Sequence, residues 1–473
     1  MNADDHRGRG AFDFPSGSRA SRRQFLKATG GLAAISALTG ARVPAVQAAS
    51  SEEIQVALIG CGGRGSGAAM NALATSKRGP IKLVAMADAY EDRLRSSHRG
   101  LSRAAGSRMD VPEERRFVGF DSYRKAMDCL RPGDVAIFAT PPAFRWVHFQ
   151  YALQKGLNVF LEKPVTVDGP TSKRMLKLAE EATAKNLKVG VGLMSRHARP
   201  LQELHQRIRN GELGEIVLMR GYRMHGPVAY FQSTPKPADI SDLDYQVRRF
   251  HSFLWASGGA FSDYYIHIID HLCWMKNAWP VKAQALGGRH FRQAADGTPF
   301  VDQNFDVYSV EYTFPDGSKF YFDGRCQEGT ATIYSSYVHG TKGMAVASAA
   351  NDCGGPSAIY KGQSATPANL LWQSGERDGN PYQNEWDVLI DAIRNDRPHN
   401  ELKRGVEASL VTSMGRMAAH TGQEITYQQM LACEHEFAPG LDKLTKDSPA
   451  PLQPGPDGRY PVPQPGITTK REY

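Results

Sequence analysis

The residues with the clearest chemical potential are Glu162, Lys163 and Pro164, which follow an apolar run at 159–161. A short apolar run predicts a buried strand, and ligands of α/β proteins bind at the carboxyl ends of such strands. A lysine buried there is either paired with an acid or has a function of its own. Pro164 restricts the backbone of Lys163 to extended conformations, which fixes the direction of its side chain. Lys163 is therefore a candidate catalytic residue.

A glycine-rich segment at 60–65 lies between a predicted strand and a predicted helix. Gly60 allows a tight turn, Gly62 lets the backbone approach a pyrophosphate, and Gly65 lets the helix pack on the strand. The helix N-terminus then offers free N–H groups and partial positive charge to the phosphates. Glycine-rich turns are common, but this one also precedes an acidic strand end. With Gly63 and Arg64, the segment predicts a dinucleotide-binding turn.

Asp88 follows the second predicted strand, at 81–87. A carboxylate at this position would accept hydrogen bonds from both hydroxyls of the adenosine ribose. Its negative charge disfavours a 2′-phosphate, so the sequence favours NAD over NADP. Arg64 and Arg93 are nearby cations, which keeps NADP as the alternative.

A third group of candidate residues, Asp263, His267 and Asp270, follows the pair Gly258-Gly259. If the segment is helical, Asp263 and His267 lie at positions i and i+4 on one face. A histidine in such a place suits general acid–base chemistry. The plainer interpretation is a buried helix with one satisfied histidine. His267 and His271 lack an HExxH context, so no metal site is predicted.

The segment from 53 to 192 alternates between strands and helices. Predicted strands lie at 54–59, 81–87, 116–120, 135–139, 159–161 and 189–192. Near-continuous apolar strands with intervening helices predict a parallel sheet covered on both faces. We therefore predict an α/β Rossmann domain at 50–192 that binds NAD(P).

The segment at 193–435 predicts an α+β C-terminal domain for substrate binding and oligomerisation. Val310, Tyr312 and Phe314 alternate with polar residues before the turn signal at 316–317, which indicates an antiparallel hairpin with 319–322. Segments 216–222 and 281–287 are candidate strands of the same open, mostly antiparallel sheet, and 387–394 and 406–420 are candidate helices. Seven prolines between 449 and 465 predict an extended or loosely docked tail at 436–473.

The N-terminus predicts export. Arg22 and Arg23 lie in the motif Ser-Arg-Arg-Gln-Phe-Leu-Lys, followed by a weakly apolar segment at 28–38 and small residues at 46–49. This layout is typical of a twin-arginine signal peptide, here 1–49, that directs a protein through the twin-arginine translocon to the periplasm. The alternatives are an uncleaved membrane anchor, for which the segment is short, and a chance pair of arginines.

The charge and the cysteine spacing argue against a nucleic-acid-binding protein and against a CxxC or zinc site. Residues 1–49 carry seven basic and three acidic residues, so the formal net charge falls from +8 to about +4 without them. No basic stripe suggests a nucleic acid partner. The six cysteines form neither a CxxC pair nor a zinc-binding spacing.

Together, these motifs resemble the Gfo/Idh/MocA family of NAD(P)-dependent sugar and polyol oxidoreductases. The resemblance extends over about 53–430 and implies that Lys163 is catalytic and lies beside the nicotinamide. It implies that Asp263 and His267 approach Lys163 from the second domain. The family's Thr-Pro turn beside the cofactor matches Thr140 and Pro141, and Glu162 and Lys163 are further cofactor-binding candidates.

The chain departs from the family pattern at several positions. Arg145 stands where relatives often have a histidine, with His148 further on. Tyr264 and Tyr265 replace small residues of many relatives. Arg196 follows the sixth predicted strand, where it could touch a substrate. The candidate substrate residues are Arg196, Tyr264 and Asp270.

The sequence thus predicts an exported, homo-oligomeric oxidoreductase whose tightly held NAD oxidises a secondary alcohol of a sugar, sugar derivative or cyclitol such as inositol. His267 would take the hydroxyl proton, Lys163 would stabilise the developing alkoxide, and Asp263 would orient His267 or bind a neighbouring hydroxyl. Two alternatives stay open. One is a redox-neutral enzyme that uses NAD to cleave glycosides or to epimerise, and the other is a non-catalytic sugar-binding protein.

Overall fold

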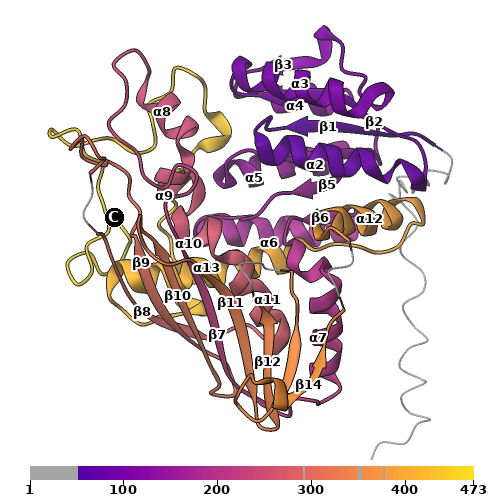
Figure 1. Cartoon of the computed structure of the whole chain (residues 1–473). Coiled ribbons are helices and arrows are strands. Elements are labelled where there is room, and N and C mark those ends of the chain that lie inside the picture. The colour runs from indigo at the N-terminus through magenta and orange to yellow at the C-terminus, as the bar shows by residue number, and fades with distance from the viewer. Residues whose placement is uncertain (1–51, 291–292, 350–353, 376–378) are drawn as a thin grey trace, which may run out of the picture. The chain divides into compact units, whose positions relative to one another are not determined.

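Two β-sheets organise the part of the chain that the computed structural model describes, residues 52–290, 293–349, 354–375 and 379–473 (Figure 1). The described residues belong to one compact unit. The predicted signal peptide at 1–49 lies outside them. No helix of the described residues is both long enough and apolar enough to cross a membrane.

The first sheet is parallel and has six strands in the order β3-β2-β1-β4-β5-β6. The order reverses beside β1, so the carboxyl ends of β1 and β4 form the crevice in which such sheets bind ligands. This confirms the predicted Rossmann sheet. Its elements are β1 (Ile54–Ile59), α2 (Gly63–Ala74), β2 (Ile81–Asp88), α3 (Glu91–Ala105), β3 (Arg116–Val118), α4 (Ser122–Asp128), β4 (Val135–Phe138), α5 (Arg145–Lys155), β5 (Asn158–Leu161), α6 (Gly169–Ala184) and β6 (Val189–Val191).

The second sheet has nine strands in the order β14-β13-β12-β11-β7-β10-β9-β8-β15. Every neighbouring pair is antiparallel except β7 and β10, so the predicted mostly antiparallel sheet and its β9–β10 hairpin are confirmed. Its strands are β7 (Ile216–His225), β8 (Lys282–Gly288), β9 (Val307–Thr313), β10 (Lys319–Cys326), β11 (Ile333–Gly340), β12 (Gly343–Ser348), β13 (Ala358–Lys361), β14 (Leu370–Gln373) and β15 (Ile425–Thr426). The sequence did not predict β11 to β14.

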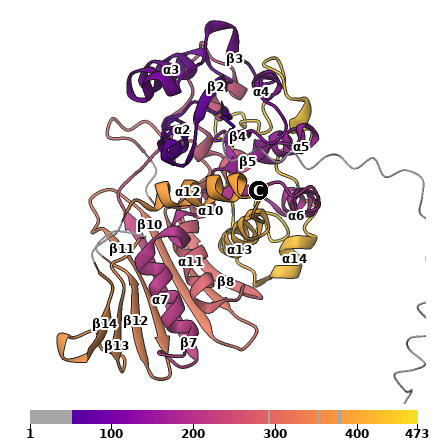
Figure 2. The ribbon, with the colours of Figure 1, turned by 90° about the vertical axis from the view of Figure 1, so that its right-hand side faces the viewer.

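Helices pack along one side of the second sheet (Figure 2). They are α7 (Arg199–Arg209), α10 (Gly259–Tyr264), α11 (Ile266–Lys276) and α13 (Leu402–Thr421). Three shorter helices complete this part of the chain: α8 (Asp242–Arg248), α9 (Leu254–Ser257) and α14 (Tyr427–Ala432). The short 3-10 helix η6 (Phe250–Ser252) lies between α8 and α9.

Helix α12 (Pro381–Arg394) comes late in the chain but packs on the first sheet. Its Trp386, Leu389 and Ile390 side chains are buried in one cluster with Leu58 of β1 and Phe160 of β5. The Trp386 indole stacks on the Phe160 ring with centroids 4.5 Å apart. The C-terminal segment therefore supplies part of the helical cover of the Rossmann sheet, which a division at residue 192 does not foresee.

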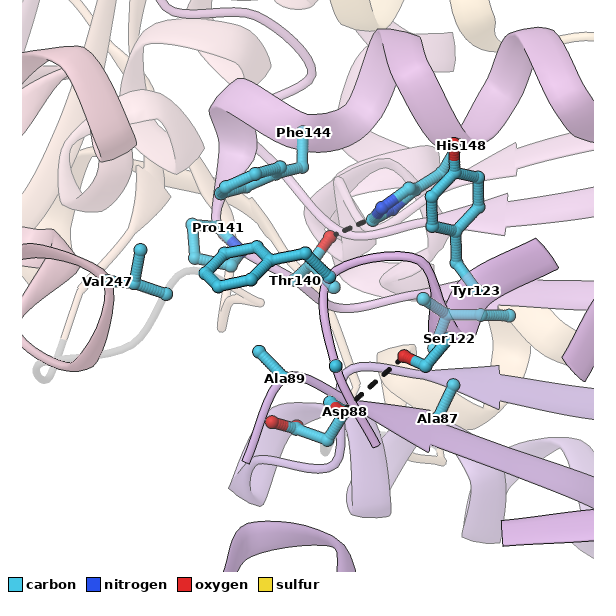
Figure 3. Close-up of a pocket in the computed structure, with 13 residues that line it drawn as sticks. Ala87, Asp88, Ala89, Ser122, Tyr123, Thr140, Pro141, Phe144, His148 and Val247 are labelled. Atoms are coloured by element: carbon cyan, nitrogen blue, oxygen red, sulfur yellow. Dashed lines mark hydrogen bonds between the residues drawn. The ribbon is translucent and has the colours of Figure 1, made fainter. Parts of the chain in front are cut away.

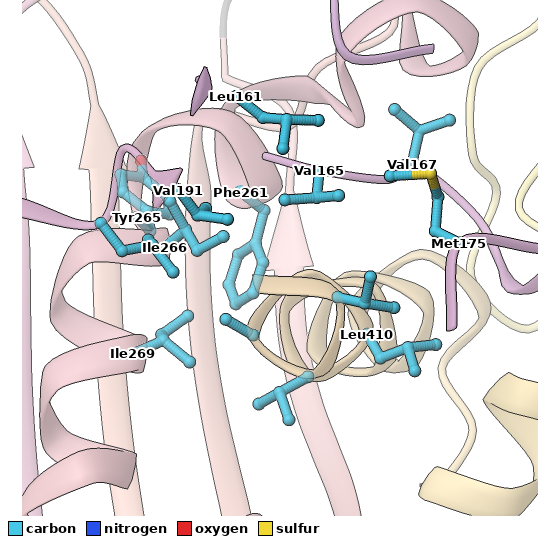
Figure 4. Close-up of a cluster of buried hydrophobic side chains, with 14 of the residues drawn as sticks. Leu161, Val165, Val167, Met175, Val191, Phe261, Tyr265, Ile266, Ile269 and Leu410 are labelled. Atoms are coloured by element: carbon cyan, nitrogen blue, oxygen red, sulfur yellow. The ribbon is translucent and has the colours of Figure 1, made fainter. Parts of the chain in front are cut away.

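Figure 4 shows a buried apolar cluster in which elements of both regions meet. Leu161 of β5 and Val191 of β6 come from the parallel sheet. Phe261 of α10, Ile269 of α11 and Leu410 of α13 come from the later part of the chain. Burying side chains of this size contributes about 1.5–3 kcal/mol each. The cluster thereby fixes α10 and α11 against the strand ends that carry the candidate site.

The C-terminal tail is extended but firmly docked. Residues 436–473 contain one 3-10 turn, η8 (Leu441–Lys443), and little other regular structure. Near the end, Glu472 accepts hydrogen bonds from Arg416 at 2.8 and 2.9 Å and lies 2.6 Å from His420 Nδ1. All three side chains are buried. The sequence predicted an extended or loosely docked tail. In the structure the tail is docked, because its Glu472 carboxylate pairs with the buried guanidinium of Arg416.

Candidate active site

The glycine turn after β1 is built for close backbone approach. Gly60 has a φ of +98°, and a Cβ on it would lie 2.5 Å from the backbone of Ala139, which follows β4. A Cβ on Gly65 would lie 2.0 Å from the Gly60 carbonyl oxygen. Neither position tolerates a side chain, so helix α2 begins tight against the strand end. Gly62 is the N-cap of α2 and Gly63 its first residue, which leaves the first N–H groups of the helix for a ligand.

Asp88 ends β2 beside this turn. Its Oδ2 accepts a hydrogen bond from the Cys61 N–H at 2.7 Å, and its Oδ1 accepts one from the Tyr90 N–H at 2.9 Å. A carboxylate has about four acceptor positions, so each oxygen can accept one more hydrogen bond. Burial raises the pKa of Asp88 above its usual value, although both backbone bonds oppose the shift. The geometry suits a carboxylate that binds two neighbouring hydroxyls.

A pocket of about 370 Å³, counting its open mouth, lies between the ends of β2 and β4 (Figure 3). Asp88, Thr140 and Pro141 line it, as do the rings of Phe120 and Phe144. The apolar walls suit a flat ring such as adenine, and Asp88 at the edge suits the attached ribose. Val247 of α8 closes the far side, so the later part of the chain also contributes to the dinucleotide site.

Lys163 lies between the parallel sheet and helix α10. Its Nζ donates a hydrogen bond to the backbone carbonyl of Asp263 at 2.5 Å and lies 3.6 Å from Asp263 Oδ1. The two side chains are only 15 % and 10 % exposed. The acid offsets part of the cost of burying the ammonium. The Lys163–Pro164 peptide bond is cis. The predicted approach of Asp263 to Lys163 is thus present in the structure.

Arg64 ties the glycine turn to the strand end that carries Lys163. Arg64 Nε lies 2.8 Å from Glu162 Oε1. The Arg64 guanidinium also stacks over the ring of Tyr382 in α12, 4.7 Å from its centroid. Arg64 is thus engaged by Glu162 and Tyr382, whereas Arg93 is the cation whose charge acts on Asp88. From the sequence alone, Arg64 and Arg93 could not be distinguished as possible partners of a 2′-phosphate.

Arg145, at the position where relatives often have histidine, is a structural link that sequence reasoning did not assign. The side chain is buried. Its Nε donates to the Glu162 carbonyl at 2.9 Å, and its Nη1 donates to the Thr140 carbonyl and, at 3.2 Å, to Thr140 Oγ1. Thr140 Oγ1 also lies 3.2 Å from His148 Nδ1. Burial lowers the pKa of Arg145 to about 10. Arg145 therefore joins the ends of β4 and β5 at the cofactor turn.

His267 does not pair with Asp263 as the sequence predicted. Helix α10 ends at Tyr264 and α11 begins at Ile266, with Tyr265 between them at a ψ of −11°. This interruption breaks the regular i, i+4 relationship. No acceptor or donor among the described residues contacts His267 Nδ1. Burial, together with the positive charges of Lys163 and Arg223, holds the pKa of His267 well below its usual range.

The histidine that does meet Asp263 is His251, which the sequence analysis missed. His251 Nε2 lies 3.6 Å from Asp263 Oδ2, on the side away from Lys163's contact with Oδ1. Its Nδ1 is buried and has no hydrogen-bond partner among the described residues. Burial lowers the pKa of His251, and Asp263 opposes the shift. No local spacing marks His251, because η6, α9 and α10 must fold back to bring it to Asp263.

Two of the three candidate substrate residues are engaged with each other. Arg196 donates to both carboxylate oxygens of Asp270, at 2.7 to 3.2 Å. Asp270 is fully buried, so in this structure its carboxylate is closed to a substrate. The third candidate, Tyr264, is partly exposed and its hydroxyl accepts a hydrogen bond from Arg223.

The residues fit a dinucleotide better than a metal. Within the described ranges, no group of three or more histidines, cysteines or acids could hold a metal ion. By contrast, the turn has no room for side chains at Gly60 and Gly65, a helix N-terminus follows it, and Asp88 keeps free acceptor positions beside an apolar pocket. Cys61 and Cys273 are buried, and Cys129 and Cys433 are half-buried; none of these four forms a disulfide within the described ranges.

Comparison with known families gives two adjoining matches. Residues 54–193 match the model described as "Oxidoreductase family, NAD-binding Rossmann fold". Residues 201–346 match the model described as "GFO/IDH/MocA C-terminal domain". The two matches follow the same division of the chain as the parallel and the mostly antiparallel sheet.

Individual relatives are distant. The chain is 28% identical over 159 residues to inositol 2-dehydrogenase of Corynebacterium glutamicum, a match covering 33% of this chain and 44% of the relative. It is 26% identical over 210 residues to the rhizopine catabolism protein MocA of Rhizobium meliloti, covering 42% of this chain and 59% of the relative. A solved structure, aldose-aldose oxidoreductase from Caulobacter crescentus, shares the fold with a TM-score of 0.57 at 16% identity, over 79% of this chain and 100% of the relative.

Proposed function

Because the chain belongs to the Gfo/Idh/MocA family of oxidoreductases, we propose that it is an NAD-dependent dehydrogenase of a secondary alcohol in a sugar, sugar derivative or cyclitol. One observation carries the proposal: Lys163 meets Asp263 at the carboxyl end of β5, beside the glycine turn. The inositol 2-dehydrogenases among the relatives support the substrate class.

Each side chain of the site has its own role in the proposed reaction. A nicotinamide dinucleotide supplies the hydride acceptor when it is bound. Lys163 would donate a hydrogen bond to the substrate oxygen and stabilise the negative charge that develops there. Asp263 holds the ammonium in place through its carbonyl and carboxylate. His267 has a pKa that burial and the positive charges of Lys163 and Arg223 hold well below the usual range. It would therefore be neutral at pH 7 and able to accept the hydroxyl proton, as a weaker base than an ordinary histidine.

His251 is a second candidate for the base. Its Nε2 is the ring nitrogen that faces the Asp263 carboxylate, and an acid beside a histidine stabilises the imidazolium that forms when the ring takes a proton. In either case, Lys163 and Asp263 keep their roles.

NAD is the proposed cofactor, with NADP as the alternative. The carboxylate of Asp88 would repel a 2′-phosphate and accept hydrogen bonds from the free ribose hydroxyls. Arg64 is paired with Glu162. Arg93 Nη2 donates to the Arg248 carbonyl at 3.3 Å and is the cation through which NADP binding would have to act.

We also propose that the chain is exported through the twin-arginine pathway with its cofactor already bound. The motif at Arg22 and Arg23 supports export, and this pathway carries folded proteins. Contacts between α8 and α3 support retention: Arg248 pairs with Asp92 at 3.2 Å, and the Tyr90 hydroxyl, next to the adenosine pocket, donates to Asp244 at 3.2 Å. They join the segment that follows Asp88 to the helix that carries Val247, and both Asp88 and Val247 line the pocket.

The test is to purify the mature protein, denature it and assay the supernatant for NAD and NADP. We expect NAD to survive gel filtration with the protein, and sugars or cyclitols to reduce it without added cofactor. Cleavage or epimerisation of a sugar with no net NADH would favour the redox-neutral alternative. Cofactor-free protein that binds NAD weakly and reduces none would contradict the proposal.

A further inference from the structure

Arg223 lies on the face of β7 that packs against the helices. Side chains alternate between the faces of a strand, and Gly221 of β7 faces α11, since a Cβ on it would lie 2.5 Å from Ile268. Arg223 is two residues further along and therefore shares this face. Its parallel neighbour on β10 is Gly324, and a Cβ there would lie 2.5 Å from the ring of Tyr265. Arg223 is thus placed at the junction of α10 and α11.

Two tyrosines fix the orientation of the Arg223 guanidinium. Tyr334, directly opposite on β11, has its ring centroid 3.4 Å from the guanidinium carbon. Tyr264 at the end of α10 has its centroid 4.3 Å away on another side and also accepts a hydrogen bond from Nη2. Stacking of this kind holds the planar group in one orientation, but it does not neutralise its charge.

The positive charge of Arg223 has no acidic partner among residues 52–290, 293–349, 354–375 and 379–473, and its Nε is buried without an acceptor. Two other interior arginines differ in this respect. Arg196 is neutralised by Asp270, and Arg416 by Glu472. Burying a guanidinium whose N–H donor has no acceptor costs free energy, and a ligand that accepts this hydrogen bond would remove the cost.

Arg223 also lies next to the residues proposed to react. Tyr264, which it contacts, directly follows Asp263, and Asp263 holds Lys163. His267 is close enough to both cations that Lys163 and Arg223 each lower its pKa. A substrate that contacts Lys163 and His267 would therefore extend toward Arg223.

We propose that Arg223 binds a negatively charged substituent of the substrate, so that the substrate is an acidic sugar carrying a carboxylate or a phosphate and not a neutral sugar or cyclitol. The forked donors of arginine recognise both oxyanions. This inference rests on the proposed function, since it assigns a substrate class to the same site.

The experiment compares matched ligands on the dinucleotide-loaded protein. Glucuronate and gluconate represent the carboxylate, glucose 6-phosphate the phosphate, and glucose and myo-inositol the neutral forms. Equilibrium binding and reduction of the bound dinucleotide are measured separately. We expect at least one acidic ligand to bind about 10- to 100-fold more tightly than its neutral counterpart, and the difference to shrink at high salt.

Variants identify the residue responsible. Arg223→Gln should abolish the preference for acidic over neutral ligands, and Arg223→Lys, which keeps the charge without the fork, should retain part of it. Arg220→Gln is the matched control, because Arg220 lies on the same strand, on the opposite face, and donates to His339 at 3.0 Å. Arg220→Gln should leave the preference unchanged. Thermal unfolding and retained dinucleotide confirm that each variant is folded.

The two proposals fail in different ways. Neutral ligands that bind as tightly as acidic ones to the unaltered protein, or a preference that survives Arg223→Gln, would overturn the role of Arg223. Reduction of the dinucleotide by neutral sugars would in that case still support the dehydrogenase. Acidic ligands that bind through Arg223 but reduce no dinucleotide would support this inference and count against the proposed function.

Discussion

Lys163 and Asp263, one hundred residues apart in the chain, meet through a 2.5 Å hydrogen bond to the Asp263 carbonyl and a 3.6 Å approach of Nζ to Oδ1. The parallel sheet supplies the lysine and helix α10 supplies the acid. Neither region alone contains the pair, so the site depends on the buried cluster that joins them (Figure 4).

The roles of His251 and His267 can be separated by their pH profiles. If His267 is the base, His267→Gln should lower kcat about 10²- to 10⁴-fold. His251→Gln should then affect kcat only indirectly, because His251 contacts Asp263. Because the pKa of His267 is held well below its usual range, we expect no loss of activity in the unaltered protein between pH 7 and about pH 6. An acid limb that only His251→Gln removes would make His251 the base.

Arg145 should be essential for the cofactor turn. Arg145→Leu would leave the Thr140 and Glu162 carbonyls, which Arg145 now bonds, without a donor. Each buried unsatisfied group costs about 1–3 kcal/mol, so denaturant unfolding should show a total loss of about 2–5 kcal/mol and weaker dinucleotide binding. Arg145→Lys keeps a positively charged donor group. Its stability and its affinity for the dinucleotide should lie between those of the unaltered protein and those of Arg145→Leu. A stable Arg145→Leu variant that binds NAD normally would refute this role.

Asp88 should control the choice between NAD and NADP. Asp88→Asn removes the charge that disfavours a 2′-phosphate and one of the acceptors for the Cys61 and Tyr90 N–H groups. We expect weaker binding of NAD and a higher ratio of NADP to NAD affinity, measured by titration of cofactor-stripped protein. Tighter binding of NADP than NAD to the unaltered protein would show that Asp88 does not discriminate as proposed.

Buried histidines should make the fold sensitive to acid. Burial lowers the pKa of His148 to about 3 and that of His271 to about 4. The unfolded chain protonates a histidine near pH 6.5, so below that pH the unfolded state binds more protons and stability falls as the pH drops. For His271 the loss between pH 6.5 and pH 4 amounts to about 3 kcal/mol.

Urea unfolding at a series of pH values from about 7.5 to 4.5 would measure this loss. His271→Gln should be less stable at neutral pH, because Ser336 loses a partner at 2.8 Å. The stability of this variant should depend less on pH than that of the unaltered protein. Parallel curves for the two proteins would mean that His271 does not titrate as described.

Local features of the site were predictable because they depend on short-range patterns. The glycine turn, the position of Asp88 and the strand that ends before Lys163 all follow from strand periodicity and turn chemistry. The strand β1 (Ile54–Ile59) has the predicted bounds. The predicted helix through Asp263 and His267 is interrupted at Tyr265. The sequence has no glycine or proline at this position from which the break could be predicted.

Long-range features were not predictable in the same way. His251 reaches Asp263, and Arg223 reaches Tyr264, only after separate elements have folded together. The partners of Arg145 are backbone carbonyls, which carry no signal in the sequence. Helix α12 covers the first sheet, although eight of the nine strands of the second sheet lie between the two in the chain. In each case tertiary packing decides the contact.

The most direct test of the central claim is a single-turnover measurement of nicotinamide reduction by the dinucleotide-loaded protein and its Lys163→Ala variant. The panel of acidic and neutral sugars described above supplies the substrates. We predict that at least one of them reduces the cofactor, and that Lys163→Ala binds the same dinucleotide but reacts about 10²- to 10³-fold more slowly. An equal rate in the variant, with dinucleotide binding intact, would contradict the catalytic role of Lys163.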